Sequence, residues 1–173
     1  MGLFSSSKSP DEVLVEHQEL IREHIEAIID KMEAYDEEIM SGVENSDKPL
    51  QVRAKQAFNG LDGVVIDFEE KVGEIEENTR SVEETLESQA ENLENRELAQ
   101  VTKDNLMTIE TVLSHLEEEI ERLKAILQDT ESHLRDEEYE KAIQELEAAE
   151  KSDEKNLEQL RTTFENNWRE VQG

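Results

Sequence analysis

The chain has 173 residues, enough for one domain, and no cysteine, which excludes disulfides, thiolate metal sites and a cysteine nucleophile. Its 46 acidic and 18 basic residues give a formal net charge of -28, which repels nucleic-acid phosphates and anionic bilayers. Hydrophobic residues make up 35% and aromatic residues 4%, so we expect a narrow core along long helices rather than a globular centre.

The first expected helix covers residues 10 to 44, after a segment, residues 1 to 9, that we expect to be flexible. Ser9 is the predicted N-cap, Pro10 takes the first helical position, and Glu12 completes a capping box. Apolar residues then recur at intervals of three and four, which places them on one helix face. This seam consists of Leu14, Ile21, Ile25, Ile28, Met32, Tyr35 and Ile39.

The second expected helix covers residues 49 to 95 and follows a turn at residues 45 to 49, where proline stops a helix from continuing. Its seam positions follow one another at alternating intervals of four and three as far as Leu86, and Leu93 comes seven residues later. This is the pattern of a long helix with a buried seam. The seam positions are Ala54, Phe58, Leu61, Val65, Phe68, Val72, Ile75, Thr79, Val82, Leu86 and Leu93. The register slips between Leu93 and Ala99, which predicts a turn near residues 94 to 97.

Two further helices are expected, at residues 98 to 134 and 137 to 171, with a turn at residues 135 to 137. Polar Glu150 and Asp153 interrupt the last seam, which indicates either looser packing or a polar feature. Residues 10 to 173 should therefore form a single all-α domain. Its long antiparallel helical hairpins should make a four-helix bundle or a coiled-coil-like assembly.

No motif for catalysis is present: the sequence lacks Gly-x-Gly-x-x-Gly, a P-loop and Gly-x-Ser-x-Gly. The four histidines have acidic neighbours at helical spacing, as chance predicts in so acidic a chain. We therefore expect no enzyme, and no catalytic, cofactor-binding or metal site. A polar cavity around Asp153 with converging histidines would contradict this expectation.

Two small groups of residues are candidate functional positions. Lys48, Arg53 and Lys55 form a positively charged stretch at the start of the second helix, whose free amides also favour anions. They are candidates for contact with an anion or an acidic partner. Gly60 and Gly63 each cost ~1 kcal/mol relative to alanine inside a helix, so they are candidates for a hinge or for close approach of another backbone.

Two stretches resemble the PhoU family of phosphate-uptake regulators, which are built from long antiparallel helical hairpins. One is Ser9 to Glu12 with Glu16 and His17; the other is Asp136 to Ile143, followed by Glu150, Asp153, Leu157 and Leu160. The resemblance covers less than half of the chain and implies a regulator of phosphate or anion uptake. It implies no metal site, because the family's Glu-x-x-x-Asp motif is broken by Ala149 before Asp153 and by Phe58 before Asp62.

The start Met1-Gly2-Leu3-Phe4 and the first hairpin resemble ESCRT-type filament proteins, which implies a membrane-associated filament former as another alternative. The first helix of those proteins is basic for membrane contact. Residues 10 to 44 here hold twelve acidic and two basic residues, which departs from that pattern.

The leading functional hypothesis is a non-catalytic helical-bundle scaffold or regulatory adaptor that acts through protein-protein contacts or self-association. We expect a protein partner or a homo-oligomer, with no nucleic acid and no stable membrane insertion, since no apolar run approaches ~18 residues. A cytoplasmic location is expected. The acidity fits either a cationic partner or adaptation to a salt-rich, halophilic cytosol, and the sequence leaves both open.

Overall fold

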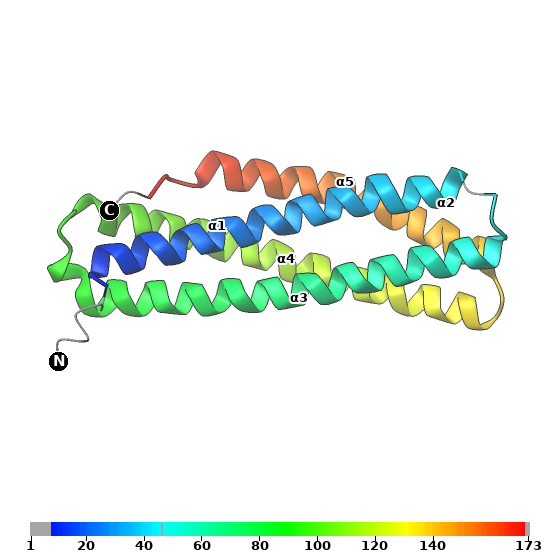
Figure 1. Cartoon of the computed structure of the whole chain (residues 1–173), viewed down its shortest axis with the longest axis horizontal. Helices are drawn as coiled ribbons and strands as arrows, with labels where there is room; N and C mark the ends of the chain where they lie inside the picture. Colours follow the sequence, from blue (N-terminus) through cyan, green and yellow to red (C-terminus); the bar gives the residue numbers. More distant parts are fainter. Residues whose placement is uncertain (1–7, 46, 172–173) are drawn as a thin grey trace.

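The computed structural model describes residues 8–45 and 47–171, and within these ranges the chain is all-α and folds as a bundle of four long antiparallel helical segments (Figure 1). This confirms the predicted fold class. The helices are α1 (Pro10–Ala34), α2 (Ser41–Asn45), α3 (Leu50–Gln89), α4 (Glu97–Arg135) and α5 (Tyr139–Asn167). A π-helical segment, Tyr35–Met40, joins α1 to α2, so that these three elements form the first long segment.

The first helix starts as its capping residues predict. The Ser9 hydroxyl accepts a hydrogen bond of 3.2 Å from the backbone N–H of Glu12, and Pro10 occupies the first turn, where its missing N–H costs nothing. Asp11 in the same turn is buried and accepts hydrogen bonds from the backbone N–H groups of Glu94 (2.9 Å) and Asn95 (3.0 Å). One carboxylate thus ties the start of α1 to the connection between α3 and α4.

That connection lies close to the predicted register slip. Helix α3 ends at Gln89, a short 3₁₀ turn covers Ala90–Asn92, and α4 begins at Glu97. The helix therefore ends six residues before the expected boundary at residue 95. Leu93 is buried within the connection, so it keeps the seam position that the sequence assigned to it although it is no longer helical.

The seam residues form one continuous core. Each long segment packs against the next one in the chain, and α3 also contacts α5. Most side chains at the predicted 3-and-4 spacing are buried, and others, such as Phe58, Leu106 and Leu157, are partly buried against the core. This spacing puts them on the face turned toward the neighbouring helices. The largest fully buried side chains are Phe68, Leu14, Ile21, Ile25, Ile28, Met40, Leu61, Ile75, Leu98, Ile109, Leu116 and Leu123.

The π-helical segment is a feature that we did not expect, because the first helix was predicted to be continuous from residue 10 to 44. A π turn contains an extra residue and so rotates the following residues around the helix axis. Tyr35 and Met40, at its two ends, are both buried. The Tyr35 hydroxyl donates to the Ala57 carbonyl at 3.4 Å, across to α3. The predicted seam residue Ile39 lies outside the described side chains.

The end of the chain also differs from expectation. Helix α5 ends at Asn167 rather than at residue 171, and residues 168–171 have no regular secondary structure. Trp168 is partly buried and packs on Phe164, with ring centroids 5.3 Å apart. The expected flexible segment falls mostly outside the described residues, since only Lys8 and Ser9 of it are described. No helix in the described part of the chain is long and apolar enough to cross a membrane.

Candidate functional site

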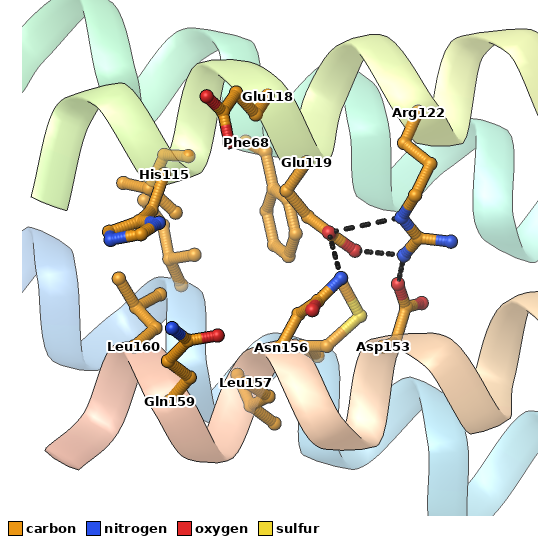
Figure 2. Close-up of a pocket in the computed structure, with 13 residues that line it drawn as sticks. Phe68, His115, Glu118, Glu119, Arg122, Asp153, Asn156, Leu157, Gln159 and Leu160 are labelled. Atoms are coloured by element: carbon orange, nitrogen blue, oxygen red, sulfur yellow. Dashed lines mark hydrogen bonds and ion pairs between the residues drawn. The ribbon is translucent and has the colours of Figure 1, made fainter.

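A cavity of about 340 Å³ lies inside the bundle where all four long helical segments converge (Figure 2). Ile28 and Met32 of α1, Phe68 of α3 and Leu116 of α4 supply apolar wall. Helix α5 contributes both apolar and polar lining, namely Asp153, Asn156, Leu157, Gln159 and Leu160. The cavity therefore has a lining that is partly apolar and partly polar.

Four polar side chains at one end of the cavity form a connected cluster, the Asp153 cluster: Glu119, Arg122, Asp153 and Asn156. Arg122 Nε donates to Glu119 Oε2 at 3.2 Å, and its Nη2 contacts both Glu119 and Asp153. Asn156 Nδ2 donates to the same Glu119 oxygen at 3.0 Å. These contacts join α4 to α5 (Figure 2).

Helical spacing places these residues. Glu119 and Arg122 lie three residues apart on α4, and Asp153 and Asn156 lie three apart on α5, so each pair shares one helix face. The side chain of Asp153 is 1% exposed, that of Glu119 14% and that of Arg122 28%. The polar interruption expected at Asp153 is thus a buried carboxyl group paired across the bundle.

The two carboxyl groups of the cluster are held in different protonation states. Burial raises the pKa of Asp153 to about 9, and its neighbour Glu119 adds to this rise. Burial alone would raise the pKa of Glu119 as well, but hydrogen bonds from Asp153 and Arg122 lower it. Near neutral pH the cluster therefore carries a protonated Asp153, an ionised Glu119 and a cationic Arg122, so that its charges balance.

Asp153 also has an oxygen without a partner. Its Oδ1 contacts Arg122, whereas its Oδ2 is buried and meets no hydrogen-bond donor among the described residues. A buried acceptor of this kind costs about 1 to 3 kcal/mol unless a proton or a donor reaches it. Protonation of Asp153 removes the charge of this buried group and so lowers the cost of burying it.

A second hollow lies beside the π-helical segment and is strongly acidic. It measures about 480 Å³ and runs between the first helical segment and α5. Its acidic lining, which we call the acidic groove, consists of Glu33, Asp36, Glu37, Glu44, Glu150, Glu154 and Glu158. Arg161 is the cation among its lining residues, and it pairs with Glu33 and Glu158.

Within the acidic groove, Asp36 has an unusual environment. Burial raises the pKa of Asp36 to about 7, and the carboxylates of Glu150 and Glu154 add to the effect. Burial also raises the pKa of Glu150, with Glu44 and Glu154 contributing. The Oδ1 atom of Asp36 is buried and has no hydrogen-bond partner among the residues that the structure describes. The groove thus concentrates negative charge that the described residues do not neutralise.

The structure does not gather the predicted cationic positions into either hollow. Arg53 donates from Nη1 to the Val43 carbonyl at 3.3 Å, so it holds α2 against α3. Lys55 is exposed, as is Lys48, and none of the three lines the cavity or the acidic groove. Anion or acidic-partner contact at Lys48, Arg53 and Lys55 stays a prediction.

The hinge residues lie inside an uninterrupted helix. Helix α3 continues through both Gly60 and Gly63. Gly63 is exposed, and a Cβ atom built there would have no other atom within 4 Å. Close approach of another backbone therefore does not account for Gly63. Hinge motion at Gly60 and Gly63 stays a prediction.

The histidines do not assemble a metal site among the described residues, where no group of three or more His, Asp or Glu side chains could hold an ion. His115 is half-buried and lines the cavity. His133 lies away from it and faces Glu138 (3.6 Å) and Glu145 (3.5 Å). A polar cavity at Asp153 is therefore present, with one histidine in its lining, and the absence of enzymatic activity stays a prediction.

The sequence analysis did not identify Glu119 or Arg122 as site residues. Glu119 was only one of the acidic neighbours that the histidines have at helical spacing, and Arg122 resembled any other charged residue on an exposed helix face. The one available signal was Asp153, a charged residue at a seam position. A buried carboxyl group requires a partner, and this could have prompted a search for a cation on the facing helices. Which cation would face it depends on how α4 and α5 pack.

In comparisons with known proteins, no family model, no curated protein and no solved structure matches this chain. Its class therefore rests on the fold alone, an all-α bundle of four long helical segments. The resemblance to PhoU proteins stays a prediction.

Proposed function

We propose that this protein is a non-catalytic helical-bundle adaptor of the cytoplasm that binds a cationic partner protein with its acidic outer faces. One observation carries the proposal: the apolar seams of the four long segments are buried within a single chain. The large apolar side chains exposed in the described part of the chain are Val52, Ile66 and Met107. Charged faces are therefore the main surface available to a partner.

Burial of the seams also bears on self-association. A second copy could use a seam only if the bundle opened, because the chain's own helices already cover it. Two copies also repel each other, since each carries a net charge of -28. Binding of another, positively charged protein is thus better supported than the homo-oligomer expected from the sequence.

The partner should be basic. Opposite charge accelerates encounter and suppresses anionic competitors. The acidic groove gathers seven carboxyl groups around Arg161. A lysine- or arginine-rich segment of a partner fits this chemistry, and we take the groove as the place to test it.

The test is a titration of the protein with an oligolysine peptide by isothermal calorimetry, at about 0.1 M and about 1 M KCl. The double variant Glu150→Gln, Glu154→Gln neutralises the acidic groove. The matched control Glu83→Gln, Glu87→Gln removes the same charge from exposed positions on α3. We expect saturable binding that weakens at high salt and a loss of about tenfold in the groove variant only.

An equal loss of peptide affinity in both double variants would show that the peptide responds to the net charge of the protein and does not bind a specific face. Light scattering and small-angle X-ray scattering at the same salt concentrations test the alternative. A compact monomer supports binding of another protein. An elongated dimer or larger assembly would contradict the proposal and make self-association the function, and compaction that appears only at high salt would assign the acidity to halophilic adaptation.

A further inference from the structure

We propose that the cavity inside the bundle is a binding site for a small amphipathic amine, whose ammonium group pairs with Asp153 and whose apolar body packs against Phe68, Leu116 and Leu160. This inference goes beyond the adaptor proposal, because it concerns the interior of the bundle and not its outer faces. It rests on the two-ended lining of the cavity, the unpartnered oxygen of Asp153, and the sign of the surrounding charge.

The cavity has an apolar part and a polar end. Phe68 and Leu116 are almost fully buried, at 1% and 2% exposure, and Leu160 is buried beside them. The Asp153 cluster lies at one end of the cavity, and His115 and Gln159 lie at the other (Figure 2). Specific small-molecule sites combine an apolar lining with a few polar groups in the same way. A ligand that fills both parts must itself be amphipathic.

The charge around the cavity selects a cation. Three carboxyl groups line the cavity, those of Glu118, Glu119 and Asp153, against the single guanidinium of Arg122. Arg122 is already engaged by two of them. An anionic ligand would meet no uncommitted cation there, and the net charge of -28 would oppose its approach. An ammonium group would instead meet an excess of acceptors.

Asp153 is the specific acceptor for that ammonium group. Its side chain is 1% exposed, lines the cavity, and leaves Oδ2 buried without a donor. Because Oδ2 is buried, the Asp153 side chain must rotate toward the cavity before an N–H donor of a ligand can satisfy this oxygen. The ligand would replace the proton that Asp153 carries in the free protein, so that each bound ammonium releases one proton and the charge of the buried cluster stays balanced.

The size and position of the cavity fit a small molecule. At ~30 Å³ per water-sized group, a cavity of about 340 Å³ holds roughly ten non-hydrogen atoms. Glu118 and Gln159 in the lining are exposed, so the cavity reaches the surface between α4 and α5. Glu118 places a carboxylate beside this opening, where it would attract the incoming cation. A bare metal ion fits less well, because much of the lining is apolar.

The test uses 2-phenylethylamine as the probe, with 2-phenylethanol and phenylacetate as neutral and anionic comparisons. Isothermal calorimetry of the full chain at pH 7 should give one saturable site for the amine. We expect binding at least tenfold tighter than that of the alcohol, and no binding of phenylacetate. Repeating the titration in buffers of different ionisation enthalpy should reveal the release of about one proton per amine bound.

Three variants locate the site. Asp153→Asn keeps the volume and should weaken amine binding at least tenfold while abolishing proton release. Glu117→Gln removes a negative charge from an exposed position on α4 outside the cavity, so it should leave affinity within about twofold. Leu160→Phe narrows the apolar part and should weaken the amine and the alcohol together. Circular dichroism of each variant confirms that the bundle is intact.

Several results would overturn the proposal. Equal affinity for amine and alcohol would make the cavity a purely apolar pocket. Equal losses in Asp153→Asn and Glu117→Gln would show that the amine senses only net charge. If the amine does not saturate a single site on the folded wild-type protein, the cavity is not an amine site, whatever the variants do.

Discussion

Gln18 on α1 and Asn105 on α4 share a hydrogen bond of 2.9 Å in the core, from Asn105 Nδ2 to Gln18 Oε1, although 87 residues separate them. Both side chains are fully buried. Gln18 also donates to Thr102 Oγ1 at 2.9 Å and to the Leu14 carbonyl at 3.1 Å. Helices α1 and α4 make few other contacts with each other, so this polar network fixes the register of α1 against α4. Buried amide side chains are known to set helix register in this way.

Asn105 also holds the end of the chain. Its Oδ1 accepts from the Arg169 backbone N–H at 2.8 Å, and its Nδ2 donates to the Arg169 carbonyl at 2.9 Å. We expect Asn105→Ala to lower the free energy of unfolding by about 2 to 4 kcal/mol, because several buried polar groups lose their partner. Urea denaturation measures this, and Lys103→Ala, at an exposed neighbouring position, is the control.

The same variant should shift the fluorescence of Trp168 to longer wavelength, since the tail that contains it is released to solvent. A large loss of stability with unchanged emission would show that Asn105 does not anchor residues 168–171.

Stability should fall as pH rises. The pKa values of Asp36 (about 7) and Asp153 (about 9) are raised in the folded protein. At any pH between the ordinary pKa of an aspartate and these raised values, the native state therefore holds more protons than the unfolded state. The free energy of unfolding then decreases with pH. We expect it to be several kcal/mol higher at pH 5.5 than at pH 8.5, because each proton that only the native state holds contributes about 1.4 kcal/mol per pH unit.

Asp153→Asn is the control for this pH dependence, because asparagine does not titrate. The slope between pH 7 and 9 should flatten in the variant, while the part due to Asp36 below pH 7 remains. Stability that rises with pH in the wild-type protein would contradict the protonation of Asp153.

Loss of Arg122 should destabilise the bundle. Arg122→Gln leaves Glu119 without its cation in a largely buried setting, and unpaired buried charges are costly. Because Arg122 is 28% exposed, we expect about 1 to 3 kcal/mol, below the cost for a fully buried pair. The control is Arg135→Gln at the end of the same helix, whose contact with Glu131 (3.9 Å) is exposed. The control should change stability by less than about 0.5 kcal/mol.

A charge in the core should unfold the protein. Leu116 is 2% exposed at the centre of α4, so Leu116→Asp buries a carboxylate among apolar side chains and should abolish cooperative folding. Met107→Asp makes the same chemical change at a side chain that is 70% exposed on the same helix, and it should be tolerated. Circular dichroism and gel filtration separate the two outcomes, and retained helicity and size in Leu116→Asp would refute the buried seam.

Gly63 offers a test of the hinge prediction. A Cβ atom there meets no neighbour, so Gly63→Ala should stabilise α3 by about 0.5 to 1 kcal/mol, and Gly73→Ala, in equally open space, should do the same. Thermal unfolding measures both. If hydrogen exchange between residues 58 and 66 slows in Gly63→Ala and is unaffected in Gly73→Ala, the region moves as a hinge. Identical exchange in both would leave Gly63 an ordinary helical glycine.

Much of the fold could be predicted because local spacing determines which face of a helix is apolar. The 3-and-4 pattern identified the seams, the Ser9 cap marked the start of α1, and the Leu93 to Ala99 slip marked the connection before α4. The predicted helix boundaries were less accurate. Helix α3 ends at Gln89, and the connection that follows it is held by a tertiary contact, that of Asp11 with the backbone of Glu94, which the local sequence does not reveal. The π-helical segment leaves no such pattern, because it depends on packing against α3.

The candidate site could not be predicted in the same way. By itself the sequence determined an all-α, cysteine-free, strongly acidic chain with four apolar seams, because composition and helical periodicity are local properties. Only the tertiary structure decided which charged residue faces Asp153, that Gln18 meets Asn105, and that a cavity remains among four helices. These outcomes depend on the register and rotation of one helix against another. Register and rotation are in turn determined by small differences in packing energy that are summed over the whole core.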